Sequence, residues 1–488
     1  MNNKKNAISS LALQLATIAQ GLILPKLILG AFGSEVNGLV SSITQFLSFI
    51  SLLEGGLGAV VLAELYDPIE KKNDDKIQGI LGACQSFFSK LTLVFLVYTI
   101  IVAFFYPRYI DTSLSKGAVS VLVLILSMTT VAQYLFSITY RLLLQAEQKL
   151  YIVNYVSAVT ILINTTSAAV IIFVFPSIHV VKLCSGIIYM IQPMVYKAFV
   201  EKKFLKENIR KKKQHYILKN RWSGFAQNLA HFVNMNTDVA LITLFMPLQY
   251  VSVYSVHLLV INALRGIVTS VGNSYQSALG KYIAMGDSAQ LKQKFRKFEE
   301  GFWLTGMVLF FCCALLINPF IQIYTTAITD AEYYQPIFSF VIVIANMIYV
   351  IREPYRLLVL AGGKFKETNF GAFAEAIINL GMSLLLITKS GLIGVAIGTL
   401  VAIVFRLIYL VWYLHKDIIQ LGYASFSPYI VTFIVAFAVN LFVYISWPLK
   451  LNGIIRFFVA GCIVFVAECG VCGLVYWINR RIFQAIKG

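Results

Sequence analysis

Eleven ionisable side chains lie within long apolar stretches of this sequence, away from the loops that would normally carry them. A charge near the centre of a bilayer costs about 2.5 to 3.5 kcal/mol on insertion scales, so each needs a partner, a water-filled cavity or a function. At that depth a cationic side chain could bind an anionic headgroup, and a carboxylate could bind a proton or a cation. The residues are Lys26, Glu54, Arg141, Asp238, Arg265, Arg352, Glu353, Arg356, Glu375, Arg406 and Glu468.

The composition identifies lipid as the solvent for most of the chain. Its 488 residues are 59% hydrophobic and 13% charged, with a mean hydropathy of +0.78. Ordinary globular chains carry about 25% charged residues. Apolar runs of roughly 20 residues, the length that a helix needs to cross a bilayer, recur from end to end. We therefore expect an all-α, polytopic membrane protein of about fourteen transmembrane helices.

The net charge of +18 comes from basic residues whose positions along the chain follow the expected membrane topology. Basic residues gather in alternate loops, including a cluster from Lys202 to Arg221. By the positive-inside rule these loops and both termini are cytoplasmic, so the expected partners are membrane lipids and not nucleic acid. The opposite side carries only Arg108, Lys116, Lys182, Lys389 and Lys450.

The sequence contains an internal repeat, in which position i aligns with position i + 215. Tyr140 to Lys149 aligns with Tyr355 to Lys364 at six identities in ten positions. The offset equals six spans, so the two halves have the same orientation and should be related by a pseudo-twofold axis along the membrane normal. Without a gap, Asn154 matches Asn369 and Asn164 matches Asn379.

The repeat predicts the domain organisation. We expect a first six-helix lobe at 1–200, a basic cytoplasmic linker at 201–221, a second six-helix lobe at 222–417 and two further helices at 418–488. In transporters with this symmetry the substrate path normally lies between the halves, near the bilayer midplane.

The repeat also sorts the intramembrane charges. Arg141 and Arg356 are equivalent and lie near the cytoplasmic ends of their spans, which favours a shared architectural role over contact with the substrate. The remaining charges occur in one half only, as an asymmetric substrate would require. Lys26 aligns with Leu241, Glu54 with Thr269, Arg265 with Ile50, Arg352 with Ser137 and Asp238 with Ile23.

Depth along the spans suggests two charge pairs, Lys26 with Asp238 and Glu54 with Arg265. Static pairing between neighbouring helices is as good an interpretation as pairing across a substrate cavity. Arg352 and Glu353 project about 100° apart on a helix, which disfavours a mutual bridge and leaves Arg352 freer to face a cavity.

Three carboxylates, Glu54, Asp238 and Glu375, are candidates for gating or ion coupling, and the sequence does not select among them. No P-loop, G-x-S-x-G or H-E-x-x-H motif is present. Cys469 and Cys472 form a C-x-x-C inside the last span, where helix packing is a better explanation than metal or redox chemistry. We expect neither a cofactor nor a metal site, and we expect the protein not to be an enzyme.

Three motifs near the N-terminus resemble those of a known family. Leu24-Pro-Lys26 lies in the first span, and Ser34-Glu-Val-Asn-Gly-Leu39 and Leu53-Glu-Gly-Gly-Leu-Gly58 bound the second. This arrangement resembles the Wzx-type O-antigen and capsule repeat-unit flippases of the multidrug/oligosaccharidyl-lipid/polysaccharide exporter superfamily. The resemblance extends over the full length, with fourteen spans, a duplicated six-helix unit and two extra helices.

The resemblance implies a V-shaped pair of lobes around a cationic cavity in the bacterial cytoplasmic membrane. The implied activity is transfer of an undecaprenyl-pyrophosphate-linked oligosaccharide to the outer leaflet for capsule, exopolysaccharide or O-antigen synthesis. A polysaccharide polymerase and chain-length machinery are the implied partners. Arg265, Lys26 and Arg352 would then bind the diphosphate.

Three alternatives remain. A cation-coupled multidrug exporter of the same superfamily should present acidic groups to its drugs, whereas the one-sided mid-membrane charges here lean positive. A lipid II type flippase shares the plan described above. A membrane glycan polymerase should carry a large outer loop, but the longest one, near Pro107 to Lys116, has only about a dozen residues.

Overall fold

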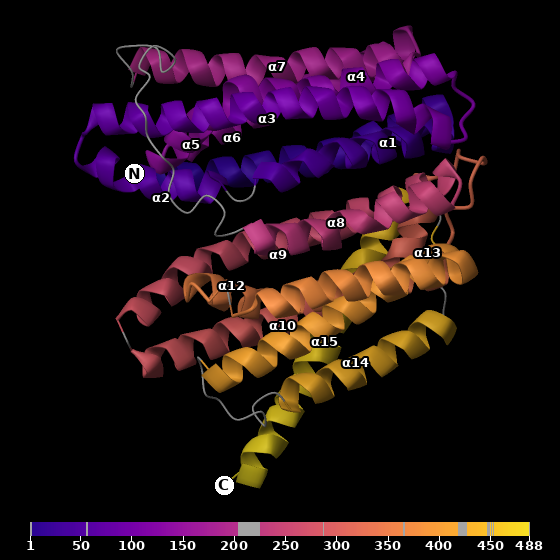
Figure 1. The fold of residues 1–488 in the computed structure, drawn as a ribbon. Helices are drawn as coiled ribbons and strands as arrows, with labels where there is room; N and C mark the ends of the chain where they lie inside the picture. Colours follow the sequence, from indigo (N-terminus) through magenta and orange to yellow (C-terminus); the bar gives the residue numbers. More distant parts are fainter. Residues whose placement is uncertain are drawn as a thin grey trace. The chain divides into compact units, whose positions relative to one another are not determined.

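The computed structural model is helical and contains no strand over the residues that it describes, namely 2–54, 57–203, 225–285, 287–364, 367–417, 427–446, 449, 451 and 453–487 (Figure 1). Eleven helical segments in this part of the chain are long and apolar enough to cross a membrane. The all-α, polytopic fold is therefore confirmed. The expected linker at 201–221 lies outside the described residues except for 201–203.

Two kinked helices account for most of the difference between the eleven segments observed and the fourteen or so spans expected, because each contains two spans. The α1 helix (Asn2–Ser48) bends at Gly33, where φ is 80°, and α13 (Asn369–Asp417) bends at Gly391, where φ is 53°. Only glycine adopts such angles without steric cost, so each glycine lets the chain change direction between two consecutive helical stretches. A shorter apolar segment, Asn236–Phe245, supplies a further candidate.

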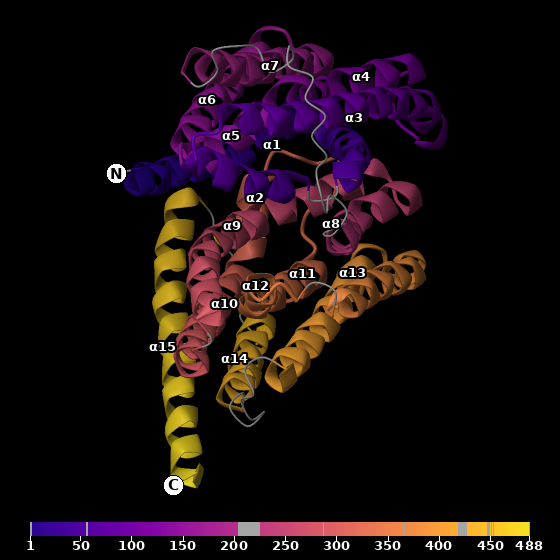
Figure 2. The same ribbon diagram turned by 60° about the vertical axis from the view of Figure 1, so that its left-hand side comes forward.

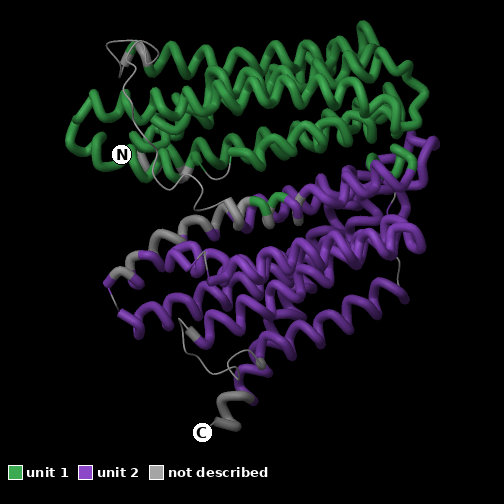
Figure 3. The backbone as a smooth tube through the Cα atoms, viewed as in Figure 1, with its two compact units in different colours: residues 1–232, 247–252 green, residues 233–246, 253–488 purple. Residues whose placement is uncertain are grey.

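Unit 1 comprises residues 1–232 and 247–252 (Figure 3). Within it α1 packs along α6, and α3 packs along α4. Besides α1, its elements are η1 (Phe49–Glu54), α2 (Leu57–Glu70), α3 (Asp74–Tyr109), α4 (Lys116–Ala132), the π-helix η2 (Gln133–Ser137), α5 (Ile138–Ala146), α6 (Leu150–Val174) and α7 (Ile178–Lys203).

Unit 2 comprises residues 233–246 and 253–488. The α11 helix packs against α10 and α13 to form its core, and α15 packs along α10 and α14 (Figure 2). Its elements are α8 (Phe225–Phe245), α9 (Leu248–Ala284), α10 (Ser288–Tyr324), α11 (Pro336–Ile351), α12 (Glu353–Ala361), α13, α14 (Ser427–Ser446) and α15 (Ile454–Lys487), although α8 and α9 each begin in unit 1.

The repeat found in the sequence has a counterpart in the backbone. Gln148 and Gly363 are aligned by the repeat, and both adopt positive φ, 56° and 65°, at the end of a short helix. Matching backbone hydrogen bonds close the two turns, so the two units share a helix-terminating motif as well as a sequence. The last bond of the turn runs from the Lys149 amide to the Leu144 carbonyl at 2.8 Å, and from the Lys364 amide to the Val359 carbonyl at 3.1 Å.

In each unit, one of the two helices that the repeat aligns is interrupted, and the interruption falls at the same aligned position. In unit 1 the π-helix η2 ends at Ser137, and in unit 2 the α-helix stops at Arg352, the residue aligned with Ser137. Pro354, which has no backbone N–H, opens α12 directly after this stop. Interruptions of this kind frequently occur at functional sites, and here one places Arg352 at a helix junction.

Candidate substrate and ion sites

Arg265 of α9 lies in a site built by α11. Its Nη1 atom donates a hydrogen bond to Asn346 Oδ1 at 3.2 Å, and its Cζ atom is 3.9 Å from the centre of the Tyr349 ring. The Asn346 amide is oriented by its own bond to the Ile342 carbonyl at 2.8 Å, so its oxygen faces the guanidinium. Arg352 Cζ lies 4.5 Å from the same ring centre. Tyr349 is thus an aromatic platform shared by two guanidinium groups.

Arg352 is held by a buried carboxylate. Its side chain is only 4% exposed, and Nη1 donates to Glu375 Oε1. The other carboxylate oxygen of Glu375 lies 3.5 Å from Arg406 Nε, and Arg406 Nη1 donates to the Thr368 carbonyl at 3.0 Å. One carboxylate therefore bridges two buried arginines and joins the α11–α12 junction to both arms of α13.

The sequence argument leaves Arg352 free to face a cavity because Glu353 cannot reach it. Glu353 indeed pairs with Arg356, whose Nε donates to it at 2.9 Å. Arg352 nevertheless has a carboxylate partner, Glu375, that is distant in sequence, so direct contact between Arg352 and a substrate stays a prediction. Arg141, the repeat equivalent of Arg356, is exposed on α5.

Asp238 lies in a buried polar network of unit 2. Its Oδ2 atom accepts hydrogen bonds from the Tyr254 hydroxyl at 2.7 Å and from Thr399 Oγ1 at 2.9 Å, while Oδ1 has no partner among the described residues. Asn379 Nδ2 donates to Thr399 Oγ1 at 3.4 Å. Ser383 Oγ completes the network, 3.4 Å from both Asn379 Oδ1 and the Val395 carbonyl.

The matching positions of unit 1 do not carry this network. The repeat aligns its members with apolar residues or cysteine, although Asn164 is retained opposite Asn379. One half of the repeat therefore has a carboxylate with several oxygen-bearing neighbours, whereas the other half has apolar residues or cysteine at the aligned positions. The aligned pairs are Asp238 with Ile23, Tyr254 with Leu39, Ser383 with Ala168 and Thr399 with Cys184.

Glu54 faces a different tyrosine within unit 1. Its carboxylate interacts with the Tyr134 hydroxyl and, electrostatically, with Arg141. Tyr134 is the repeat equivalent of Tyr349, so the same aromatic position serves a carboxylate in unit 1 and guanidinium groups in unit 2. Lys26 is exposed on α1. The pairings of Lys26 with Asp238 and of Glu54 with Arg265 join different units and stay predictions.

The neutral residues of these sites were missed by the sequence reasoning, which considered charges alone. Tyr349 could have been found from its equivalence to Tyr134. Tyr254, Asn346 and Thr399 carry no signal in the sequence because only the packing of α9, α11 and α13 brings them to the charges.

The fold, with its two repeat-related units, is that of an all-α, polytopic membrane protein. No protein-family model matches the chain, and no curated protein matches it.

Solved structures match it over most of its length. "Lipid II flippase MurJ, inward closed conformation" aligns with a TM-score of 0.69 at 14% identity, covering 98% of both chains. An inward-facing multidrug resistance MATE family transporter of the MOP superfamily aligns with a TM-score of 0.58 at 13% identity, covering 83% of this chain and 98% of that one. The MATE multidrug transporter DinF-BH aligns at 0.57 and 16% identity, covering 86% and 97%.

Proposed function

We propose that the protein is a flippase that moves an undecaprenyl-pyrophosphate-linked oligosaccharide repeat unit across the bacterial cytoplasmic membrane by alternating access. The likeness to a lipid II flippase over 98% of both chains supports the part of this proposal that concerns a lipid-linked substrate. A glycan and a diphosphate are costly to move through hydrocarbon, whereas the polyprenyl tail is not. The protein therefore needs to bind only the polar head, and a polymerase and chain-length machinery would act on the product.

The observation that carries the proposal is the position of Arg265 on Tyr349. Stacking on the Tyr349 ring and the hydrogen bond to Asn346 orient the guanidinium. A guanidinium held in this way offers N–H groups in a fixed fork, the geometry that suits bidentate recognition of phosphate oxygens. Arg265 is the residue that we assign to the diphosphate, with Arg352 supporting the Tyr349 ring.

We assign ion coupling to Asp238 rather than to Glu54 or Glu375. Glu375 already bridges Arg352 and Arg406. Asp238 instead has hydroxyl and amide neighbours and one carboxylate oxygen without a hydrogen bond among the described residues. Oxygen donors of this kind suit a proton or a small hard cation such as sodium. Binding of the cation would neutralise a carboxylate that is otherwise costly at this depth.

Lipid analysis of a deletion strain tests the proposed function. Loss of the protein should cause a lipid-linked glycan to accumulate on the cytoplasmic side, and Arg265→Ala should reproduce this defect at normal protein level. Lys294→Ala removes an exposed cation from α10 and should complement the deletion fully. Normal glycan lipids in the deletion strain would exclude the flippase.

A multidrug exporter is the second candidate, because the MATE-type neighbours share the fold and Asp238 is a buried carboxylate. Altered drug accumulation with normal glycan lipids would favour it. Accumulation of the peptidoglycan precursor alone would favour a lipid II type flippase.

A test of ion coupling uses the purified protein. Sodium chloride should raise the unfolding midpoint relative to choline chloride at constant ionic strength, or acidification should do so if a proton is the ligand. Asp238→Asn should remove the response. An equal response in wild type and variant would exclude Asp238 as the cation ligand.

A further inference from the structure

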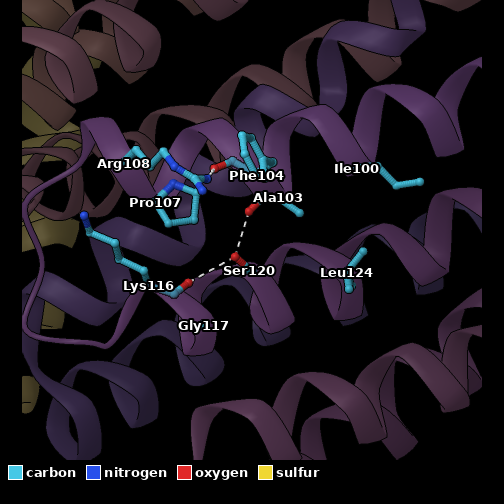
Figure 4. Close-up of a pocket in the computed structure, with 9 residues that line it drawn as sticks. All are labelled: Ile100, Ala103, Phe104, Pro107, Arg108, Lys116, Gly117, Ser120 and Leu124. Carbon is cyan, nitrogen blue, oxygen red and sulfur yellow. Dashed lines mark hydrogen bonds between the residues drawn. The ribbon is translucent and has the colours of Figure 1, made fainter.

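A pocket of about 590 Å³ opens between the end of α3 and the start of α4 in unit 1 (Figure 4). Arg108, Pro107 and Lys116 lie at one end of it, and Ile100 and Leu124 lie at the other. The pocket thus has a cationic end and an apolar end, about two helical turns apart along the same two helices. It lies in neither of the sites described above.

The apolar walls of the pocket face outward. Ile100 is 62% exposed, Phe104 52% and Leu124 47%. In a membrane-spanning helix such side chains meet acyl chains. The Ser120 hydroxyl is occupied in joining the two helices, 2.7 Å from the Ala103 carbonyl, so the wall between the ends is fixed by contacts within unit 1.

Two cations converge at the other end. Arg108 donates to the Phe104 carbonyl and stacks on the Phe104 ring, with Cζ 3.5 Å from the ring centre. Both contacts are with neutral groups, and no ion pair joins Arg108 or Lys116 to a carboxylate among the described residues. Glu35 of α1 accepts hydrogen bonds from Thr112 Oγ1 at 2.6 Å and from Ser113 Oγ at 3.0 Å, in the connection between α3 and α4. The exposed Asp111 pairs with neither cation in the described part of the chain.

This concentration of charge is unusual for the side on which it lies. The positive-inside rule makes this the non-cytoplasmic surface, whose loops carry only five cations. Two of those five line one pocket. Because the rule disfavours cations here, their placement beside an apolar groove indicates a ligand that combines a negative charge with hydrocarbon.

We propose that this pocket binds one anionic phospholipid of the non-cytoplasmic leaflet. The phosphate lies between Arg108 and Lys116, which supply charge-assisted hydrogen bonds, and an acyl chain follows Ile100, Phe104 and Leu124. Charge complementarity at one end and exposed hydrocarbon at the other select a phospholipid over free phosphate, which would leave the apolar end unused. The site is separate from Arg265 and does not depend on the proposed transport activity.

The test measures binding to the full chain purified in a neutral detergent. Phosphatidylglycerol should be retained in native mass spectra and should raise the unfolding midpoint, whereas phosphatidylcholine should do so weakly and inorganic phosphate not at all. Arg108→Ala combined with Lys116→Ala should weaken the apparent affinity for phosphatidylglycerol by on the order of tenfold. Lys389→Ala, which removes an exposed cation from the same side of the membrane, should leave it unchanged.

A second variant keeps the experiment decisive if the double variant fails to fold. Leu124→Trp fills the apolar end while both cations remain, and it should reduce phosphatidylglycerol retention without changing the response to inorganic phosphate. Equal retention by wild type, the double variant and Leu124→Trp would overturn the proposal. A midpoint shift with inorganic phosphate as large as that with phosphatidylglycerol would overturn it as well.

Discussion

Gln148 and Gly363 occupy the same left-handed backbone position in the two equivalent turns of the repeat. The conformation is suited to glycine, yet unit 1 adopts it with glutamine. The two turns therefore share a geometry although their residue types differ. The repeat is consequently visible in the backbone conformation even at aligned positions where the two residues differ.

This relationship predicts opposite effects for two substitutions. Gln148→Gly should raise stability by about 1 kcal/mol, because a residue with a Cβ pays a steric cost in this region. Gly363→Ala should lower it by a similar amount, since φ of 65° strains the new side chain while the surrounding space is open. Thermal unfolding followed by tryptophan fluorescence measures both. Shifts of the same sign would contradict the equivalence of the two turns.

Glu375→Gln should strongly destabilise unit 2. The change removes the charge that pairs with buried Arg352 and with Arg406, and breaking a buried ion pair typically costs about 3 to 5 kcal/mol. Glu367→Gln, which weakens an exposed pair with Lys364, should cost less than about 1 kcal/mol. The stabilities of the two variants are compared by measuring the half-life of each folded protein at a fixed elevated temperature. Equal half-lives for the two variants would show that the buried network contributes no specific stability.

Gly398→Ala should disturb the polar network around Asp238. An added Cβ would overlap Ser383 Oγ and stand 2.7 Å from the Ser383 amide nitrogen, so the two arms of α13 must separate. Overpacking of this kind costs about 1 to 3 kcal/mol, and the cation-dependent midpoint shift should fall with it. Gly381→Ala on the same helix meets nothing within 4 Å and serves as the matched control. A normal cation-dependent midpoint shift in Gly398→Ala would show that ion binding does not depend on this network.

Arg265→Lys should lose most of the transport activity that Arg265→Ala loses. Lysine keeps the charge, but it has neither the planar fork for two phosphate oxygens nor the flat face that stacks on Tyr349. Tyr349→Phe retains the ring and should retain most activity. Surface polysaccharide, measured at matched protein level, reports both variants. Full activity of Arg265→Lys would mean that charge alone suffices at this position.

The sequence by itself determined the class of fold, because the bilayer imposes a length and a polarity on every span that can be read residue by residue. It also determined the duplication, since Tyr140 to Lys149 and Tyr355 to Lys364 remain alike. It did not show that the spans on either side of Gly33 and of Gly391 follow each other through a single kinked residue, because such a kink depends on one backbone angle.

Only the tertiary structure decided which charges are engaged and by what. Arg352 and Glu375 lie on different helical segments, and no periodicity of the sequence links them. Asp238 and Thr399, 161 residues apart, meet only because the fold of unit 2 brings α8 and α13 together at this point. Partner choice inside a membrane depends on three-dimensional contact between helices, whereas the presence of each helix depends only on its own sequence and the lipid around it.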